Sequence, residues 1–368
     1  MLSPSEFRDL VSGRQRGPRA TLLRSLLRLA EAPYAVAMRV RNWRYDSGRA
    51  AVHFVSVPVV SVGNLTLGGT GKTPLVEWLA RWFRARGLRV ALVSRGYGAQ
   101  AASRNDEALE LEERLPDVPH LQNADRVEAA QTAVEEFDCQ VIVLDDAFQH
   151  RRLSRQLDIV LIDALEPFGF GHVFPRGTLR EPLSGLRRAH VVALSRADML
   201  SPDERAKIHE RVRRYAPHAA WIETTHAPQR LLATGGVEAG LETLKGARVA
   251  AFCGIGNPAG FRHTLTRCGC DLVDLREFAD HYAYGRADVE SLADWARKLA
   301  DTQGVTAIVC THKDLVKLAV NDLGGVPLWA VAIGLEIVAG RSELEAKLLP
   351  LCEGAAGTVL TEDPGKAG

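Results

Sequence analysis

The chain has 368 residues, of which 46% are hydrophobic and 25% charged, and its formal net charge is +1. This composition is typical of a folded globular protein of about two domains, and the near-zero charge indicates no nucleic-acid partner. The six cysteines include no C-x-x-C pair, which argues against a zinc site or a disulfide framework and favours reduced thiols in the cytoplasm. We also expect no secretory signal and no membrane-spanning helix, because no apolar run reaches about eighteen residues.

The N-terminal segment is basic and has helical apolar periodicity. Residues 1–50 contain ten arginines and no lysine, and leucines recur near helical spacing from Leu22 to Leu29. Such a helix can lie in a membrane interface, with its leucines toward acyl chains and its arginines toward anionic headgroups. It can also cover the protein's own core and keep its arginines in water. The residues alone leave both alternatives open.

Short apolar runs rich in β-branched residues predict buried strands after this segment. We expect strands at 55–62, 88–94, 139–144, 159–162 and 191–194, and helices at 73–86, 107–115, 125–137 and 203–215. Strands this apolar are covered on both faces, which is typical of a parallel sheet with crossover helices.

A second series of strands and helices begins near residue 247, after a mixed segment at 219–237 that has a turn at His226-Ala227-Pro228. The strands of this series are expected at 247–252, 273–276, 306–311 and 328–333, with helices from 259 and at 287–301. We therefore predict an α/β fold, with a mostly parallel sheet of the P-loop NTPase type and a second, smaller α/β lobe. The predicted divisions are an N-terminal helix region at 1–45, a P-loop lobe at 46–225, a second lobe at 226–345 and a tail at 346–368.

A glycine-rich turn follows the first predicted strand and leads into a helix. Its sequence is Gly68-Gly69-Thr70-Gly71-Lys72-Thr73. Backbone N–H groups in such a loop face a phosphate, the lysine reaches the β- and γ-phosphates of ATP, and the Thr73 hydroxyl binds Mg²⁺. The usual pattern is G-x-x-x-x-G-K-[ST], and its first position here is Thr66. The alternative is a glycine-rich turn with an exposed lysine.

Two carboxylates, Asp145 and Asp146, end the apolar strand at 139–144. In a P-loop fold this position carries the acidic residue that helps to hold the metal. A solvated strand end is the alternative for either residue, and Asp163 after the next strand is a weaker competitor. Beside the phosphate loop, the pair predicts a magnesium ligand.

Several motifs together resemble one family. Ser61-Val62-Gly63-Asn64-Leu65-Thr66 runs into the glycine-rich turn, and four motifs follow in order: Ser94-Arg95-Gly96-Tyr97-Gly98, Asp145-Asp146-Ala147-Phe148-Gln149-His150, Pro175-Arg176-Gly177-Thr178-Leu179-Arg180-Glu181-Pro182 and Phe278-Ala279-Asp280-His281. This set resembles tetraacyldisaccharide 4′-kinase, the lipid A 4′-kinase, over nearly the whole chain. Thr at the first position of the phosphate loop is typical of that family.

The resemblance implies a reaction in which the ATP γ-phosphoryl group passes to the 4′-hydroxyl of a tetraacylated glucosamine disaccharide 1-phosphate. The implied cofactors are ATP and Mg²⁺. The implied partners are this acylated disaccharide phosphate and the inner-membrane surface, with the enzyme peripheral on its cytoplasmic face, and we expect a monomer. Since the substrate lipid lies in the inner leaflet, the resemblance favours the membrane-interface reading of the N-terminal helix.

The resemblance also implies residue roles. The family's catalytic carboxylate matches Asp106, in an Asn-Asp-Glu triplet where the family has Gly-Asp-Glu, and its histidine partner matches His281. The family often has a second histidine after that one, and this chain has Tyr282 there. The implied magnesium site comprises Thr73, Asp145 or Asp146, and Glu181, while Lys72 acts in catalysis. Arg180 and Asn64 are implied to contact substrate.

Simpler alternatives stand beside these roles: a core histidine for His281 and a surface ion pair for Arg180 and Glu181. The stretch Thr311-His312-Lys313-Asp314 has a family counterpart, and the sequence predicts no role for it. The competing function classes are a P-loop nucleotide-switch NTPase and a soluble small-molecule kinase. The first would need clustered metal ligands or a guanine-reading motif, and the chain shows neither.

Overall fold

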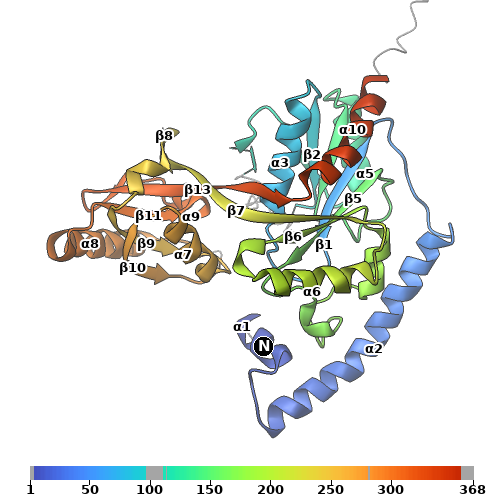
Figure 1. Cartoon of the computed structure of the whole chain (residues 1–368), viewed down its shortest axis with the longest axis horizontal. Helices are drawn as coiled ribbons and strands as arrows, with labels where there is room; N and C mark the ends of the chain where they lie inside the picture. Colours follow the sequence, from blue (N-terminus) through green and yellow to red (C-terminus); the bar gives the residue numbers. More distant parts are fainter. Residues whose placement is uncertain (1–3, 97–110, 113, 281, 358–368) are drawn as a thin grey trace, which may run out of the picture. The chain divides into compact units, whose positions relative to one another are not determined.

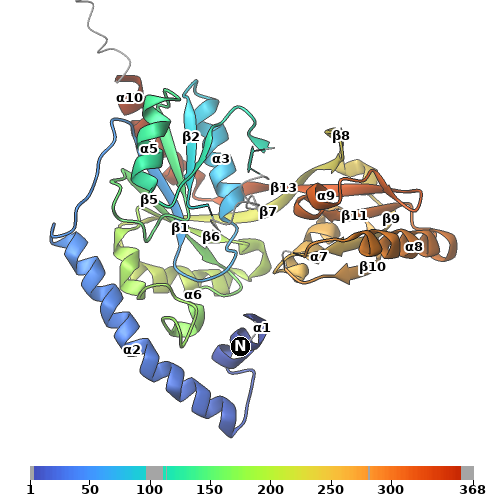
Figure 2. The same cartoon turned by 180° about the vertical axis from the view of Figure 1, so that it is seen from behind.

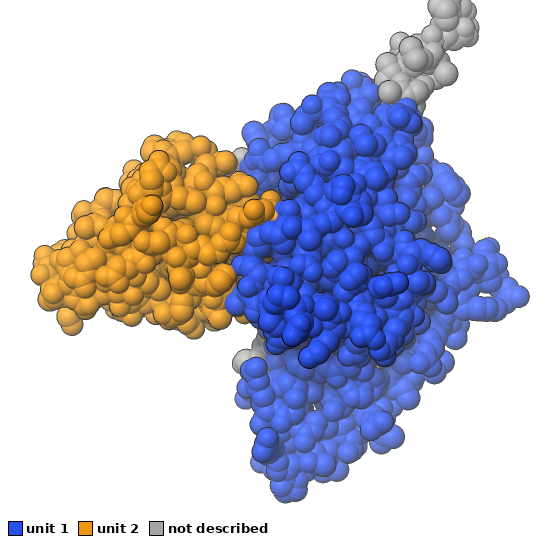
Figure 3. Space-filling model, in the orientation of Figure 1, with its two compact units in different colours: residues 1–105, 111–225, 337–368 blue, residues 106–110, 226–336 orange. Residues whose placement is uncertain are grey.

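The computed structural model describes residues 4–96, 111, 112, 114–280 and 282–357, which form two compact units (Figures 1 and 3). Within the described residues, unit 1 comprises 4–96, 111–225 and 337–357, and unit 2 comprises 226–336. The chain therefore leaves unit 1 after residue 225 and returns to it at residue 337.

Unit 1 contains a parallel sheet with the strand order β7-β6-β5-β1-β4-β2-β3. Its strands are β1 (Val59–Asn64), β2 (Val90–Ser94), β3 (His120–Gln122), β4 (Val141–Asp145), β5 (Leu157–Asp163), β6 (Val191–Ser195) and β7 (Ala220–Ala233). Every residue of β1, β2, β4 and β6 is buried, as expected of strands that are covered on both faces. The predicted α/β class with a mostly parallel P-loop type of sheet is confirmed.

The helices of unit 1 beyond the N-terminal segment connect and cover these strands (Figure 1). They are α3 (Lys72–Arg84), α5 (Arg126–Glu135), α6 (Pro202–Arg213) and α10 (Arg341–Gly357), with 3₁₀ turns η1 (Gly169–Gly171), η2 (Leu183–Arg188) and η3 (Ala197–Met199). Local chemistry sets where two of them begin. The Asp125 carboxylate caps α5 by accepting a hydrogen bond from the Val127 N–H, and Ser201 and Glu204 form a capping box on α6.

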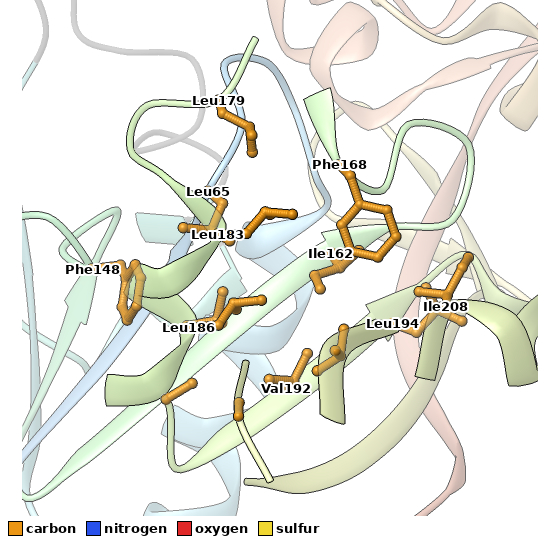
Figure 4. Close-up of a cluster of buried hydrophobic side chains, with 14 of the residues drawn as sticks. Leu65, Phe148, Ile162, Phe168, Leu179, Leu183, Leu186, Val192, Leu194 and Ile208 are labelled. Carbon is orange, nitrogen blue, oxygen red and sulfur yellow. The ribbon is translucent and has the colours of Figure 1, made fainter. Parts of the chain in front are cut away.

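One core cluster of unit 1 is drawn in Figure 4. Ile208 of α6 belongs to it, together with Ile162 of β5 and Val192 and Leu194 of β6. The same cluster includes Leu65, which directly follows β1. The chain entering the glycine-rich turn is therefore fixed by apolar packing.

The N-terminal segment folds as α1 (Pro4–Ser12) and the 29-residue helix α2 (Pro18–Asp46), which runs along the outside of unit 1 (Figures 1 and 2). Pro33 lies inside α2. Among the described helices, none combines the length and apolar character needed to cross a bilayer.

Unit 2 has its own parallel strands in the order β10-β9-β11-β13, and β12 runs antiparallel to β13. Its elements are β8 (Val237–Ala239), η4 (Leu241–Leu244), β9 (Arg248–Cys253), α7 (Pro258–Arg267), β10 (Asp271–Glu277), α8 (Arg286–Gln303), β11 (Ala307–Thr311), α9 (His312–Leu318), β12 (Asp322–Leu323) and β13 (Val326–Ala339). Two strands, β7 and β13, carry the chain from one unit into the other.

Two sequence expectations need correction. The segment at 219–237, expected to be mixed with a turn at Pro228, contains the 14-residue strand β7. Its residues 220–223 pair with β6 and its residues 231–233 with β8, and Pro228 lies between these stretches, so its missing N–H costs neither ladder a hydrogen bond. The predicted strand at 55–62 begins only at Val59. The helix expected at 107–115 lies mostly outside the described residues.

Candidate active site

The glycine-rich turn connects β1 to α3 at the carboxyl end of the sheet. Gly68 has φ 113° and Gly71 has φ 79°, a backbone region that favours glycine, and Gly71 is the residue that caps α3. The first N–H groups of α3 have no partner within the helix and carry the positive end of its dipole. The turn therefore has the backbone geometry of a phosphate-binding loop, and β1 lies between β4 and β5, inside the sheet.

Three consecutive carbonyl oxygens of this loop are held by side chains from elsewhere in unit 1. The pairs are Asn64 Nδ2 with Gly68 O at 3.3 Å, Arg196 Nη2 with Gly69 O at 3.3 Å and Ser195 Oγ with Thr70 O at 2.8 Å. In a trans peptide the N–H points opposite to the C=O, so the N–H groups of the next residues, 69 to 71, face away from these donors. Side chains of unit 1 itself therefore hold the cradle in this orientation.

Lys72, Asp146 and Arg180 form an ion-pair cluster beside the loop. The Lys72 Nζ lies 3.5 Å from Asp146 Oδ1, and Arg180 Nη1 donates to both carboxylate oxygens of Asp146 at 2.9 Å. Burial acts to raise the pKa of Asp146, but the charges of Lys72 and Arg180 outweigh it and hold that pKa below its usual value. Asp146 has φ 50°, so its backbone is strained at this position.

The two other predicted carboxylates of strand ends lie in different surroundings. Asp145 is 8% exposed, ends β4 and pairs in register with Val62 of β1. Asp163 ends β5 and accepts two hydrogen bonds from the Arg196 guanidinium. Asp163 also ends a strand that pairs with β1, but its carboxylate is engaged by Arg196. Magnesium binding by Asp145 or Asp146 stays a prediction.

The Glu181 side chain is fully buried and accepts hydrogen bonds at both oxygens. Its donors are Asn42 Nδ2 at 2.7 Å, Gln149 Nε2 at 3.1 Å and Arg188 Nη2 at 2.8 and 3.1 Å. Magnesium coordination by Glu181 stays a prediction, and it would require Glu181 to exchange these partners. The carboxylate therefore connects Asn42 of helix α2 to Gln149 and Arg188.

Asn64 is also fully buried, and its backbone oxygen accepts a hydrogen bond from Gln149 Nε2 at 3.0 Å. Its amide group holds the Gly68 carbonyl, so contact between Asn64 and the substrate stays a prediction. Sequence reasoning had not assigned roles to Gln149, Ser195 or Arg196. Ser195 ends the apolar strand β6 and Arg196 follows it, and this strand end is the signal in the sequence that could indicate them.

Asp106 and His281 lie outside the described residues, and their roles stay predictions. In unit 2, the stretch 311–314, for which no role is predicted, places the fully buried Asp314 at the centre of several hydrogen bonds. Its carboxylate accepts from Thr311 Oγ1 at 2.6 Å, Tyr284 Oη at 2.9 Å and the Gly254 N–H at 3.1 Å. Asp314 therefore connects three segments. They are the start of α9 at Thr311, the loop that begins at Gly254 after β9, and the segment with Tyr284 after β10.

No group of three or more His, Cys, Asp or Glu side chains in the described part of the chain is arranged to hold a metal ion. A P-loop magnesium site does not need one, because Mg²⁺ takes one or two carboxylates and completes its shell with phosphate oxygens and water. The Thr73 hydroxyl at the start of α3 and the carboxylate of Asp145 are hard oxygen donors of the kind that Mg²⁺ prefers. The residues present therefore fit this ion.

Comparison with known proteins decides the family. The sequence model of the tetraacyldisaccharide-1-phosphate 4′-kinase family, LpxK, matches residues 23–353. The chain belongs to this family. Tetraacyldisaccharide 4′-kinase from Anaeromyxobacter sp. strain K is 42% identical over 351 residues, covering 90% of this chain and 92% of that protein. The counterpart from Geobacter sulfurreducens is 36% identical over 345 residues, covering 89% and 93%.

The fold agrees with this family as well. The crystal structure of LpxK from Aquifex aeolicus in complex with ATP is 27% identical and superimposes with a TM-score of 0.69, covering 89% of this chain and 99% of that one. The resemblance inferred from the sequence motifs is therefore confirmed. The LpxK family model begins at residue 23, so helix α1 and the start of α2 lie outside the matched region.

Proposed function

We propose that this chain is an ATP-dependent lipid kinase that transfers the γ-phosphoryl group to the 4′-hydroxyl of tetraacyldisaccharide 1-phosphate. The observation that carries the proposal is the phosphate cradle held by side chains of unit 1, with Lys72 beside it, in a member of the LpxK family. Phosphoryl transfer needs little covalent chemistry from the protein, and it depends on positioning and on charge neutralisation. The cradle supplies the positioning, and Lys72 supplies positive charge.

When bound, Mg²⁺ would supply positive charge that neutralises the charge developing on the transferred phosphoryl group. We assign its protein ligands to Thr73 and Asp145. Asp146 is the weaker candidate because its carboxylate already holds Lys72 and Arg180, and both cations would have to be released to free it. In this arrangement Asp146 positions the two cations.

Asp106 is assigned as the base that accepts the proton of the acceptor hydroxyl, and His281 as the residue that orients it. Both assignments rest on the family motifs. A carboxylate suits this role because it is ionised at neutral pH and can stand within hydrogen-bond reach of the hydroxyl. Arg180, which donates to Asp146 beside the loop, is assigned to a phosphate of the nucleotide or acceptor.

Helix α2 supports peripheral binding to the cytoplasmic face of the inner membrane. One side of it is attached to the active-site segments: the Tyr34 hydroxyl donates to the Arg180 carbonyl at 3.0 Å, Arg41 to the Gln149 carbonyl at 2.6 Å and Asn42 to Glu181. The other side carries large apolar side chains that are 49–73% exposed, namely Leu22, Leu26, Leu29, Val36, Val40 and Trp43. Their spacing of three, four or seven residues places them on one helical face.

This exposed apolar face, flanked by arginines, has the chemistry of an interfacial helix. The two sequence-based readings of the segment are therefore compatible. The helix packs on unit 1 with one face, and we propose that the other face enters the lipid surface that contains the acceptor.

The test is transfer of ³²P from the γ-position of ATP to tetraacyldisaccharide 1-phosphate in detergent micelles. Wild type is compared with Lys72→Ala and Asp106→Ala, and each variant should lose about a hundredfold or more in kcat. A wild-type protein that hydrolyses ATP and leaves the lipid unlabelled would refute the lipid-kinase proposal. It would favour a nucleotide switch on the same scaffold.

A further inference from the structure

Helix α1 places an arginine on the phosphate loop. The helix is anchored to unit 1, because Leu10 and Val11 are buried and Arg176 Nη1 donates to the Val11 carbonyl at 3.0 Å. The Phe7 ring also packs on Phe174, with centroids 6.3 Å apart. These contacts fix the helix that carries Arg8, four residues into α1.

The Arg8 guanidinium lies against Gly68. A Cβ atom at position 68 would come within 2.8 Å of Arg8 Nη2, so the guanidinium lies directly on the loop backbone. Arg8 is half-exposed, and the Glu166 carboxylate lies 3.8 Å from its Nε, beyond hydrogen-bond distance. One oxygen of Glu166 already accepts a hydrogen bond from Thr178 Oγ1 at 2.7 Å.

Charge balance distinguishes Arg8 from the other cations near the loop. Lys72 and Arg180 share Asp146, and Arg196 donates two hydrogen bonds to Asp163. Among the described residues, the ion-pair partner of Arg8 is Glu166 at the long distance of 3.8 Å, and the Nη2 side of Arg8 faces the loop. A guanidinium with free donors beside a phosphate cradle is suited to bind phosphate oxygens through two parallel hydrogen bonds.

We propose that Arg8 is a catalytic arginine that binds the γ-phosphoryl oxygens of the bound nucleotide. The inference rests on the proposed kinase function and extends it to a residue outside the region matched by the family model. Arginines delivered to the phosphate loops of other nucleotide enzymes stabilise the charge of the transition state in the same manner. Here the arginine comes from the same chain.

Arg8 takes no part in bond exchange. The acceptor hydroxyl oxygen attacks the γ-phosphorus, the bond from this phosphorus to the β–γ bridging oxygen breaks, and ADP leaves with that electron pair. The hydroxyl proton passes to the carboxylate assigned as the base. Arg8 donates hydrogen bonds to oxygens whose charge changes during this step, so its loss should lower kcat more than it raises the KM for the acceptor.

The first arm of the test measures transfer to tetraacyldisaccharide 1-phosphate with Arg8→Ala, Arg8→Lys and Arg14→Ala. Arg14 is a matched control, since it follows the same helix and also lies 3.8 Å from its carboxylate, Asp9. We expect Arg8→Ala to lose about a hundredfold or more in kcat, with the acceptor KM changed less than about twofold. Arg8→Lys should recover part of the loss, and Arg14→Ala should behave as wild type.

The second arm measures nucleotide binding by calorimetry, without turnover. Arg8→Ala should raise the Kd for the non-hydrolysable analogue AMP-PNP by about tenfold and the Kd for ADP by less than about twofold, because ADP has no γ-phosphate. Equal changes for both nucleotides, or equal kcat losses for Arg8→Ala and Arg14→Ala, would overturn the inference. If wild type leaves the lipid unlabelled, the proposed function fails, and the calorimetric arm still decides on Arg8.

Discussion

The Lys72 ammonium lies 3.5 Å from Oδ1 of Asp146, and both side chains are largely buried at the mouth of the phosphate loop. Asp146 thereby holds the lysine beside the loop. The charges of Lys72 and Arg180 hold the pKa of Asp146 below its usual value, so this carboxylate is ionised at neutral pH and pairs with the lysine.

The Lys72–Asp146 pair predicts non-additive kinetics. Lys72→Met should lower kcat about a hundredfold or more, and Asp146→Asn should lower it less, since Lys72 would keep its charge and lose its position. The double variant should be no slower than Lys72→Met alone, because Asp146 would then have no lysine to position. The measurement is a double-mutant cycle on kcat, and strictly additive losses would show that the two residues act separately.

Ser195 predicts a link between the loop carbonyls and ATP affinity. Ser195→Ala removes the hydrogen bond to the Thr70 carbonyl and leaves that oxygen without this donor, at a cost of about 1–3 kcal/mol. We expect the Kd for ATP to rise by about tenfold, measured by calorimetry. Ser201→Ala, which removes the cap of α6, is the control: it should lower stability by about 1 kcal/mol and leave the Kd unchanged.

The buried charge of Glu181 predicts a large difference between two neighbouring arginines. Arg188→Met would leave Glu181 without its cation and should cost about 3–5 kcal/mol in the free energy of unfolding. Arg187→Met removes an exposed partner of Asp46 and should cost less than about 1 kcal/mol. Urea denaturation at neutral pH measures both, and similar losses would mean that Glu181 is compensated by its neutral donors alone.

His150 predicts part of the pH dependence of stability. Burial, with the charges of Arg126 and Arg155, lowers the pKa of His150 to about 4. Between pH 6.5 and about 4 the unfolded chain binds a proton that the folded chain does not, so stability falls as the pH falls through this window. At pH 5 the loss relative to pH 7 should be about 1–2 kcal/mol smaller in His150→Gln than in wild type.

Urea denaturation at pH 7 and pH 5 measures this difference for His150. The exposed His218 supplies the control, and His218→Gln should retain the wild-type loss of stability. An unchanged loss in His150→Gln would show that another group titrates in this range.

The exposed leucines of α2 predict membrane affinity. Leu26→Ser combined with Leu29→Ser should weaken sedimentation with anionic vesicles by at least about tenfold, since each buried leucine contributes about 1.5–3 kcal/mol. Leu165→Ser replaces a leucine of unit 1 that is 47% exposed and lies outside α2, and should leave binding unchanged. If wild type, the double variant and Leu165→Ser bind the vesicles equally, the apolar face of α2 does not contact lipid.

The parts of the site that can be predicted from the sequence are formed by residues close to one another along the chain. The phosphate loop, its strand and its helix occupy one continuous stretch, where glycine positions and apolar runs determine the backbone. Asp145 and Asp146 were predictable because the end of a parallel strand is a defined place in such a sheet. In each case the neighbours along the chain carry the information.

The supports of the loop were not predictable in this way. Ser195 lies 125 residues from Thr70 and Arg8 lies 60 residues before Gly68, and only the tertiary fold brings these pairs together. Glu181 shows the same limit: its motif implied a metal ligand, while three of its donors come from distant segments or from the turn that follows it. Strand β7 was missed because Pro228 is normally a turn signal.

The two strands that cross between the units also have a consequence for biosynthesis. Helix α10 follows β13 and returns to unit 1, where Trp82 donates to Glu345 at 3.3 Å and the Arg341 guanidinium lies 5.9 Å from the Trp78 ring. When only the first 225 residues have emerged from the ribosome, the strands of unit 1 up to residue 225 are therefore available, but helix α10 is not. Unit 1 reaches its final packing only after residues 226–336 have emerged, so a truncated transcript should yield an incompletely covered sheet rather than a smaller working enzyme.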